Sequence, residues 1–207
     1  MPTDEELLDA WRAGQRAAGQ SLVERHNRSL YAFFVSKAAE NVDELLQRTW
    51  LACTESRVSF RGEGTFRGFL FGIARHELFG YFRRARRDRG AFDPGSQSVA
   101  DLATSPSQLV ARKREHALMY RAMRAVSLDD QIVLELFFWE ELGGAELGQV
   151  LGVSEAAARS RLARARGRLA DKMAELSDSA EVLSSVSGDL EGWATSLRAW
   201  LREAEGI

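Results

Sequence analysis

The stretch AELGQVLGVSEAAARSRLARARGRL, from Ala145 to Leu169, decides the fold that we expect for this chain. Ala145–Leu151 is rich in apolar side chains and predicts a short helix. Gly152 comes next, and glycine tolerates the positive φ that a sharp turn requires. Ser154 is suited to cap a following helix, because its hydroxyl can accept a hydrogen bond from a backbone N–H of the next turn. A helix, a glycine turn and a second helix of about 15 to 18 residues predict a helix-turn-helix, whose second helix enters the DNA major groove.

The second helix of this stretch has one apolar face and one basic face. At about 100° per residue, the apolar stripe, which we expect to pack on the preceding helices, consists of Ala158, Leu162, Ala165 and Leu169. The opposite side carries Arg159, Ser160, Ala163, Arg164 and Gly167, flanked by Arg161, Arg166 and Arg168. Arginines beside small residues suit close approach to phosphates and base edges. A solvated basic face would give the same pattern, but the Gly-Val-Ser turn in front of this helix favours DNA.

The charges of the chain are unevenly distributed. The net charge of the 207 residues is only −2, which by itself does not indicate a nucleic-acid partner. Residues 57–87 hold eight arginines against two glutamates, and residues 154–172 hold six basic against two acidic residues. By contrast, residues 128–149 hold six acidic residues and no basic one, and residues 174–207 hold seven acidic against two basic. Two basic patches in an otherwise acidic chain predict two contact zones for a polyanion.

The N-terminal part of the chain predicts four helices separated by short breaks. Their expected bounds are Asp4–Ala18, Ser21–Ala39, Val42–Ser56 and Phe66–Arg87. Gly62 and Gly64 break the pattern before the last helix, so residues 57–64 should form a loop, and Thr65 can cap the helix that follows. This last helix is apolar on nearly every side near its start, which predicts that it is surrounded by protein there.

The far end of the Phe66–Arg87 helix mixes aromatic residues with arginines. Tyr81 and Phe82 are followed there by Arg83, Arg84, Arg86 and Arg87. This combination suits single-stranded nucleic acid, because bases stack on aromatic faces while arginines hold the backbone. A core helix with a solvated basic end would give a similar pattern. We therefore expect most of the aromatic residues of this helix to be core and only one or two to touch DNA.

Residues 88–107 predict an interdomain linker, because they contain Pro94, Pro106, two glycines and several serines and have no helical stripe. Helical patterns resume at Gln108–Val126 and Asp129–Glu141, ahead of the helix-turn-helix. The expected fold is all-α. It comprises a helical domain over residues 1–87, the linker over 88–107, a four-helix domain over 108–174 and a C-terminal extension over 175–207.

The C-terminal extension has an amphipathic helical pattern. Its apolar positions follow in steps of three and four and comprise Leu183, Val186, Leu190, Trp193, Leu197 and Trp200. Gly188 and Gly192 weaken such a helix by about 1 kcal/mol each, and the opposite face is acidic and rich in serine. The plainest interpretation is that this helix packs on its own chain. The alternatives are an acidic helix that covers and regulates the basic DNA-contacting surfaces or the linker, and a helix for self-association or for another protein.

Four segments, in this order, resemble those of bacterial RNA polymerase sigma factors of the extracytoplasmic-function (ECF) type, group four of the sigma-70 superfamily. DELLQRTWL, from Asp43 to Leu51, is similar to the family's acidic polymerase-binding helix. FRGEGTF, from Phe60 to Phe66, followed by FLFGIAR over residues 69–75, is similar to its promoter-melting segment. Ser105-Pro106-Ser107 is similar to the end of its linker. Residues 146–169 are similar to the helix-turn-helix that recognises the minus-thirty-five element.

The resemblance implies that the chain is the promoter-specificity subunit of bacterial RNA polymerase, with no cofactor and no catalytic residues. It equates residues 1–87 with sigma region 2 and residues 108–174 with sigma region 4. The implied partners are core RNA polymerase, through its β′ clamp helices and β flap, and promoter DNA. An anti-sigma factor is a further candidate partner, and no membrane contact is implied. The linker would follow the RNA exit path of the polymerase.

The resemblance also assigns residues to these contacts. The residues for binding core polymerase are Asp43, Glu44, Leu45, Gln47 and Trp50. The residues for the minus-ten element are Arg61, Thr65, His76, Tyr81, Arg83 and Arg84. The loop over residues 57–65 would hold a flipped base, at a cost of roughly a few kcal/mol by analogy with base-flipping enzymes. The residues for the minus-thirty-five element and its phosphates are Ser154, Arg159, Ser160, Arg161 and Arg164.

The sequence departs from the family pattern at three places. Arg48 stands where an acidic residue is usual, which alters the electrostatics of the polymerase contact. His76 stands where asparagine is frequent, which points to an unusual minus-ten sequence. The extension over 175–207 is absent from the shortest members, so no role for it follows from the resemblance.

Two other classes of protein are weaker interpretations. An ordinary helix-turn-helix regulator with a ligand- or signal-sensing N-terminal domain would share the C-terminal half, but the acidic helix and the glycine-rich loop before a basic aromatic helix argue against it. An enzyme is disfavoured because His26, His76 and His116 are isolated in the sequence. His76-Glu77 begins a zincin-like motif, but Gly80 stands where the second metal ligand belongs. The sequence contains no P-loop and no nucleophile elbow.

The single cysteine, Cys53, excludes a disulfide framework and a zinc-finger spacing within this sequence. It falls in an apolar helical pattern, so we expect a buried thiol. No metal site is predicted. The sequence shows no signal peptide and no apolar run long enough to span a membrane, so the expected location is the cytoplasm.

Overall fold

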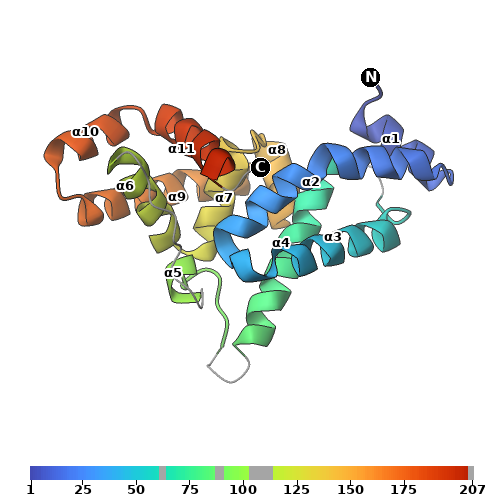
Figure 1. Cartoon of the computed structure of the whole chain (residues 1–207), viewed down its shortest axis with the longest axis horizontal. Helices are drawn as coiled ribbons and strands as arrows, with labels where there is room; N and C mark the ends of the chain where they lie inside the picture. The colour runs from blue at the N-terminus through green and yellow to red at the C-terminus, as the bar shows by residue number, and fades with distance from the viewer. Residues whose placement is uncertain (61–63, 87–90, 103–113, 205–207) are drawn as a thin grey trace. The chain divides into compact units, whose positions relative to one another are not determined.

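The computed structural model describes residues 1–60, 64–86, 91–102 and 114–204, apart from the side chains of Trp193, Trp200 and residues 201–204 (Figure 1). This described part is helical and holds no strand, only one isolated β-bridge, between Ser98 and Ser127. The all-α prediction is therefore confirmed for it. The chain divides into two compact units, Met1–Asp88 with Gly143–Ala158, and Arg89–Leu142 with Arg159–Ile207. This division differs from the expected one, because residues 143–158 cluster with the N-terminal unit.

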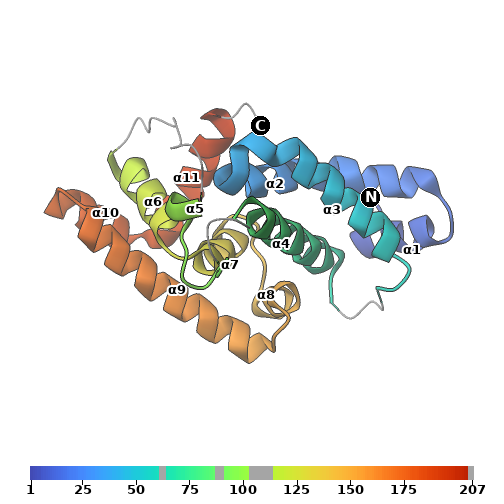
Figure 2. The ribbon, with the colours of Figure 1, turned by 90° about the horizontal axis from the view of Figure 1, so that it is seen from below.

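The first unit is built around a central helix. Its elements are α1 (Asp4–Arg12), α2 (Arg16–Ala38), a 3-10 turn (Ala39–Asn41), α3 (Val42–Ser56), α4 (Phe66–Ala85) and α8 (Gly144–Leu151). Helix α4 packs against α1, α2, α3 and α8, as the view in Figure 2 shows for its neighbours α3 and α8. The contact between α4 and α8 explains why residues 143–158 belong to this unit.

The first helical segment is split where the sequence predicted one helix over Asp4–Ala18. Helix α1 ends at Arg12, and α2 begins at Arg16 rather than at the expected Ser21. Gly14 lies between them with a φ of +96°, a left-handed conformation that ends a helix and that glycine adopts without strain. The bounds of α3 match the prediction.

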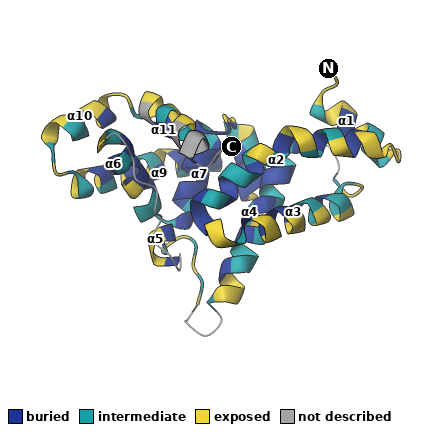
Figure 3. Cartoon of the chain, viewed as in Figure 1, coloured by how far each residue is buried: buried dark blue, intermediate teal, exposed yellow. Residues whose placement is uncertain are grey.

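Helix α4 provides much of the core of the first unit, as Figure 3 shows by burial. Its fully buried side chains are Phe66, Leu70, Phe71, Ala74 and Leu78. Thr65 caps the helix as predicted, since its Oγ1 accepts a hydrogen bond from Gly68 N at 3.1 Å. Cys53 of α3 is also fully buried, and burial raises the pKa of its thiol to about 12. The prediction of a buried thiol is confirmed.

A buried histidine links α1 to α2. His26 Nε2 lies 2.6 Å from Asp4 Oδ2, and the second carboxylate oxygen of Asp4 accepts a hydrogen bond from Arg25 at 2.5 Å. Burial lowers the pKa of His26, and this effect outweighs the neighbouring carboxylate of Asp4, which acts in the opposite direction. His26 is therefore a structural residue of the N-terminal unit.

The second unit contains α5 (Val99–Leu102), α6 (Arg114–Ala125), α7 (Leu128–Phe138), α10 (Ala180–Gly188) and α11 (Leu190–Ala204), together with α9 (Glu155–Leu176) from Arg159 onward. The prediction of a linker without helix over residues 88–107 is wrong for α5, whose Val99 and Leu102 are buried. The preceding residues are also fixed, because Leu128 N donates to Gln97 O at 2.8 Å. Residues 103–113, which include the predicted start of the next helix, lie outside the described residues.

The C-terminal extension forms two helices rather than one continuous helix. Helix α10 ends at Gly188 and α11 begins at Leu190, with Asp189 in a non-helical conformation. Helix α11 packs against α6 and α7, and α10 packs against α6. Val186 and Leu197 are fully buried, and Trp139 Nε1 donates to the backbone oxygen of Ala194 at 3.0 Å. These contacts favour the interpretation that the extension packs on its own chain.

Two polar contacts strengthen this packing. Arg198 Nη2 lies 3.0 Å from Glu140 Oε1, and both side chains are largely buried. His116 Nε2 on α6 lies 2.8 Å from Ser196 Oγ on α11. None of the described helices is long and apolar enough to cross a membrane.

Candidate nucleic-acid interface

The turn between α8 and α9 has the geometry that the sequence predicted. Gly152 has a φ of +66° and ends α8 in the left-handed conformation. The backbone folds back closely, since Val153 N donates to Gly148 O at 2.9 Å. A Cβ atom on Gly148 would lie 2.8 Å from Val153 O, so only glycine fits there. Ser154 caps α9, because its Oγ accepts from Ala157 N at 3.3 Å.

Helix α9 has the two faces that its sequence predicted. The buried stripe consists of Ala158, Leu162, Ala165 and Leu169, and it continues to Met173. The exposed residues on the other side include Ser154, Arg159, Ser160, Ala163, Arg164 and Gly167, while Arg161 is half-buried. Arg164 Nη1 makes only a long hydrogen bond of 3.4 Å to Ser160 Oγ, so it can turn toward a ligand at little cost. This face can present guanidinium groups to phosphates and base edges.

Two arginines of α9 are instead engaged with the protein. Arg168 donates to both carboxylate oxygens of Asp130 at 2.5 and 2.6 Å, and this hydrogen bonding raises the pKa of Arg168. Arg166 pairs with Glu191 of α11 and lies 5.1 Å from the ring centroid of Phe138. The basic flank of α9 is thus divided between residues that hold the helix in its unit and residues available to a ligand. The helical pattern alone could not make this distinction.

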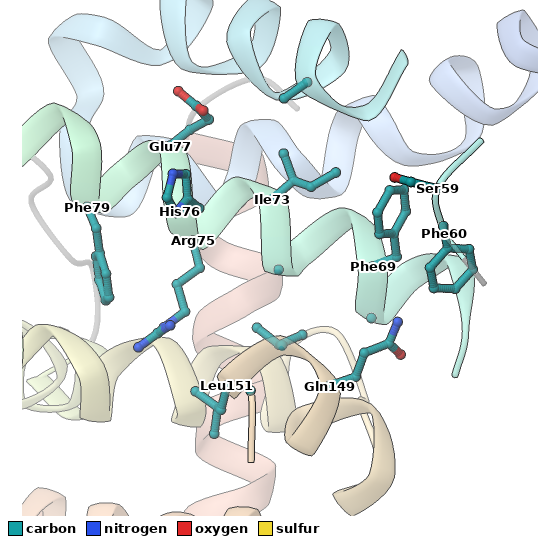
Figure 4. Close-up of a pocket in the computed structure, with 15 residues that line it drawn as sticks. Ser59, Phe60, Phe69, Ile73, Arg75, His76, Glu77, Phe79, Gln149 and Leu151 are labelled. Atoms are coloured by element: carbon teal, nitrogen blue, oxygen red, sulfur yellow. The ribbon is translucent and has the colours of Figure 1, made fainter. Parts of the chain in front are cut away.

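The first unit contains a second surface suited to nucleic acid, an open pocket of about 670 Å³ (Figure 4). Residues of α3, of the loop after it and of α4 line one side, and residues 149–151 of α8 with Gly152 line the other. Phe60 and Phe69 stack at one end with ring centroids 4.5 Å apart. At the other end, the guanidinium of Arg75 lies 4.3 Å from the ring centroid of Phe79. Aromatic faces next to a cation are what single-stranded bases and their phosphates require.

The residues predicted for the minus-ten element lie along α4, in different environments. His76 is exposed in the pocket, and Arg83 and Arg84 are exposed at the end of α4. Tyr81 is half-buried, and its hydroxyl accepts a hydrogen bond from Asn41 Nδ2 at 2.9 Å. Burial raises the pKa of Tyr81, and the nearby carboxylates of Glu40 and Glu44 add to this.

The two remaining positions predicted for the minus-ten element are Arg61 and Thr65. Arg61 lies outside the described residues. Thr65 is half-buried, and its backbone and side chain bond to residues of α8. The predicted set missed the aromatic and basic residues that line the pocket, namely Phe60, Phe69, Arg75 and Phe79. The aromatic–arginine mixture was the signal for them, but helical periodicity did not separate them from the core residues of α4.

The exposed face of α3 carries most of the residues predicted to bind polymerase. Asp43, Glu44 and Gln47 are exposed. Leu45, however, is only 1% exposed, so it belongs to the core and cannot offer an apolar surface in this conformation. Leu51 is 60% exposed and is the apolar residue that this face does present. Trp50 is half-buried, and its Nε1 donates to Asn27 Oδ1 at 3.0 Å.

Arg48, the unusual basic residue of α3, is paired with acidic residues. Its Nε lies 2.8 Å from Glu44 Oε1, one helical turn earlier, and its Nη1 lies 3.8 Å from Glu77 Oε2 on α4. These pairs partly neutralise Arg48 and leave Asp43 as the acidic group at the start of the helix. Within the described residues, no group of three histidine, cysteine or carboxylate side chains is placed to hold a metal ion.

Comparison with known proteins identifies two family regions and several relatives. Residues 22–88 match the family model described as sigma-70 region 2, and residues 116–169 match that described as sigma-70, region 4. The chain is 26% identical over 147 residues to the ECF RNA polymerase sigma factor SigX of Bacillus subtilis, with 68% of this chain and 76% of SigX covered. It is 28% identical over 164 residues to the ECF RNA polymerase sigma factor SigM of Mycobacterium tuberculosis, with 78% of this chain and 80% of SigM covered.

A solved structure shares the fold of most of the chain. The sigma factor RpoE of Bartonella quintana, crystallised with the anti-sigma factor NepR, superposes with a TM-score of 0.56 at 20% identity. The superposition covers 77% of this chain and 98% of RpoE. The two region models, their order along the chain and the named relatives lead to one conclusion. This chain belongs to the sigma-70 family of RNA polymerase sigma factors, as a member of the ECF type.

Proposed function

We propose that this protein is the promoter-specificity subunit of bacterial RNA polymerase. The observation that carries the proposal is the presence, on one chain, of two different nucleic-acid surfaces. One is a helix with exposed arginines behind a helix-turn-helix turn, and the other is a pocket of aromatic and basic residues along α4. A repressor or activator that binds duplex DNA needs only the first of them. A protein that also holds a separated strand needs the second.

The two surfaces divide promoter recognition between duplex and single strand. Arg159, Ser160 and Arg164 lie on the exposed face of α9, where bidentate guanidinium contacts to guanine and charge-assisted bonds to phosphate can form. This face is our candidate for the minus-thirty-five element. The pocket along α4, with His76 exposed in it and Arg83 and Arg84 beyond it, is our candidate for the separated strand of the minus-ten element.

Attachment to core polymerase is assigned to α3. Asp43, Glu44 and Gln47 offer polar contacts to the β′ clamp helices, and Leu51 replaces Leu45 as the apolar contact. Residues of region 4 are the candidates for the β flap. An anti-sigma factor is a further candidate partner, supported by the complex of the related RpoE with NepR. The protein would act in the cytoplasm, where polymerase and promoters meet, by binding rather than by catalysis.

The test is binding to purified bacterial core RNA polymerase in the absence of DNA. We expect a stoichiometric complex on gel filtration. We also expect Leu51→Asp to weaken it, while Leu183→Asp, on the half-buried apolar side of α10, serves as the control for a charge placed elsewhere. An ordinary helix-turn-helix regulator would bind duplex DNA alone and would not bind core polymerase. That result would show that the protein is instead an ordinary helix-turn-helix regulator.

A further inference from the structure

The side chain of Gln149, on α8, binds both backbone groups of Thr65. Gly64 and Thr65 directly precede α4 in the loop expected to hold a flipped base, and we call these two residues the strand-binding loop. Gln149 Oε1 accepts a hydrogen bond from Thr65 N at 3.0 Å, and its Nε2 donates to Thr65 O at 3.1 Å. Glu146, one turn earlier on α8, accepts a hydrogen bond from Thr65 Oγ1 at 2.8 Å. Both backbone groups and the hydroxyl of Thr65 therefore bond to α8, a helix of the helix-turn-helix that lies 81 to 84 positions away.

Two glycines form the slot in which the Gln149 amide lies. A Cβ atom on Gly64 would lie 2.2 Å from Gln149 Oε1, and a Cβ atom on Gly68 would lie at the same distance. Neither distance is possible between real atoms, so any other residue at these positions would expel the amide. Gly64 also has a φ of +100°, which favours glycine independently. The backbone of Gly68 does not require glycine. A side chain at this position would instead disturb the close approach of Gln149.

The groups that hold Gln149 are the groups that could hold a nucleobase. A planar amide with one acceptor next to one donor has the same pattern as the N1 and N6 edge of adenine or the N3 and N4 edge of cytosine. Gln149 and Gly68 line the same pocket as the stacked pair Phe60 and Phe69 (Figure 4), and aromatic faces are where an unstacked base binds. Gln149 therefore occupies, within the same chain, a place suited to the edge of a flipped base.

We propose that Gln149 is an intramolecular plug, which closes the strand-binding loop in the free protein and must leave before a base can enter. This inference rests on the proposed function, because it assumes that the loop binds a separated DNA strand. Glu146 reinforces the closure, since its carboxylate lies beside Thr65 and would repel an approaching phosphate. Its second oxygen accepts from Gly143 N at 3.1 Å and so caps α8, which holds the carboxylate in place.

The plug would couple the two DNA-binding elements. Gln149 lies on α8, which leads through the turn into α9. Helix α8 therefore cannot stay bound to the loop while the helix-turn-helix binds a distant duplex site. The free protein would consequently bind single strands weakly. Anything that draws α8 away from α4, such as binding of the helix-turn-helix to another surface, would free the slot. The closure thereby favours recognition of a separated strand only after region 4 is engaged elsewhere.

A pair of glycine substitutions in α4 gives a matched test. Gly68→Ala places a methyl group where Gln149 lies, and the three heavy atoms nearest to it belong to the flexible end of that side chain. Gly72→Ala adds the same methyl group one turn later, where the nearest atom is Val150 Cα at 3.9 Å. Alanine favours the helix equally at both positions, so the two variants differ chiefly in whether they expel the amide. Gln149→Ala removes the plug from the other side.

The measurement is the affinity of the full-length protein, without polymerase, for a fluorescein-labelled pool of random 20-nucleotide single strands. Loss of two neutral hydrogen bonds should tighten binding by about tenfold in Gln149→Ala but not in Gly72→Ala. Gly68→Ala should show no gain, because its methyl group fills the place where the edge of a base would lie. Adding Gly68→Ala to Gln149→Ala should remove the gain, because the methyl group fills the slot that the amide has left. Equal affinities for Gln149→Ala and Gly72→Ala, or weaker binding by Gln149→Ala, would overturn the proposal.

A second measurement follows the contact itself and needs no DNA. Hydrogen exchange of the Thr65 amide should be slow in the wild type and in Gly72→Ala, and several-fold faster in Gln149→Ala and Gly68→Ala. Equal exchange in all four proteins would show that the plug does not form. Failure of the wild type to bind core polymerase would defeat the proposed function instead, whereas the exchange result would still show whether α8 closes the loop.

Discussion

Arg164 and Arg168 lie one helical turn apart on α9, yet the structure predicts different consequences of losing them. Arg164 is exposed, and its guanidinium makes only the 3.4 Å hydrogen bond to Ser160. Arg164→Ala should therefore change the free energy of unfolding by less than about 0.5 kcal/mol. If Arg164 contacts a base, its loss should weaken promoter binding by about 1–3 kcal/mol, which corresponds to roughly 5- to 150-fold.

Arg168→Ala should instead lower stability. The guanidinium of Arg168 donates two short bonds to Asp130, whose side chain is only 9% exposed. Removing it leaves a nearly buried carboxylate without these donors, at a cost of about 1–3 kcal/mol. Because the Arg168 side chain is itself 52% exposed, water can replace part of the interaction, and we expect about 1–2 kcal/mol. Promoter affinity, measured below the melting temperature, should change little.

The assay combines urea unfolding with holoenzyme binding to a promoter fragment identified by run-off transcription. Both variants should bind core polymerase as the wild type does. Arg164→Ala should shift the DNA affinity and leave the unfolding midpoint unchanged, and Arg168→Ala should do the reverse. A pure phosphate contact by Arg164 would weaken all sequences alike and reduce the salt slope by about one. Equal effects of the two variants on both observables would refute the division of α9 into ligand-facing and protein-facing arginines.

Three further predictions concern the fold. Cys53, fully buried and with its pKa raised to about 12, should react with a thiol reagent in the native protein far more slowly than in urea; comparable rates would contradict its burial. Burial lowers the pKa of His26 below the ordinary value of about 6.5, so the unfolded chain binds a proton first as the pH falls. The free energy of unfolding should therefore decrease below about pH 6.5, and His26→Gln should reduce this dependence on pH. Leu197→Ala, at a fully buried position of α11, should lower the stability of the second unit by about 2–5 kcal/mol, whereas an unchanged unfolding midpoint would show that the extension does not pack on α6 and α7.

The sequence predicted those features of the fold that depend on short-range patterns. The apolar stripe of α9 follows from the 3.6-residue period, and the caps Thr65 and Ser154 follow from hydroxyl chemistry at a helix start. Gly152 was identified because a turn needs its positive φ. These signals lie within a few residues of the structure that they specify.

The features that the sequence did not predict depend on contacts between distant residues. The bidentate pair of Arg168 with Asp130 spans 38 positions, and no local pattern distinguishes Arg168 from Arg164. Leu45 was assigned to the polymerase contact by the resemblance alone, and its burial became visible only in the structure. The slot for Gln149 is formed across 84 positions. Its glycines could be recognised as loop signals, but what they make room for required the structure.

The measurement that tests the central claim most directly is run-off transcription by core polymerase with and without this protein, on DNA fragments of the genome that encodes it. If the protein is the promoter-specificity subunit, its addition should produce discrete new start sites. Arg164→Ala should reduce these transcripts while binding core polymerase normally. If core polymerase gives the same transcripts with and without the protein, although the protein binds duplex DNA, the account is contradicted, and the protein is an ordinary DNA-binding regulator.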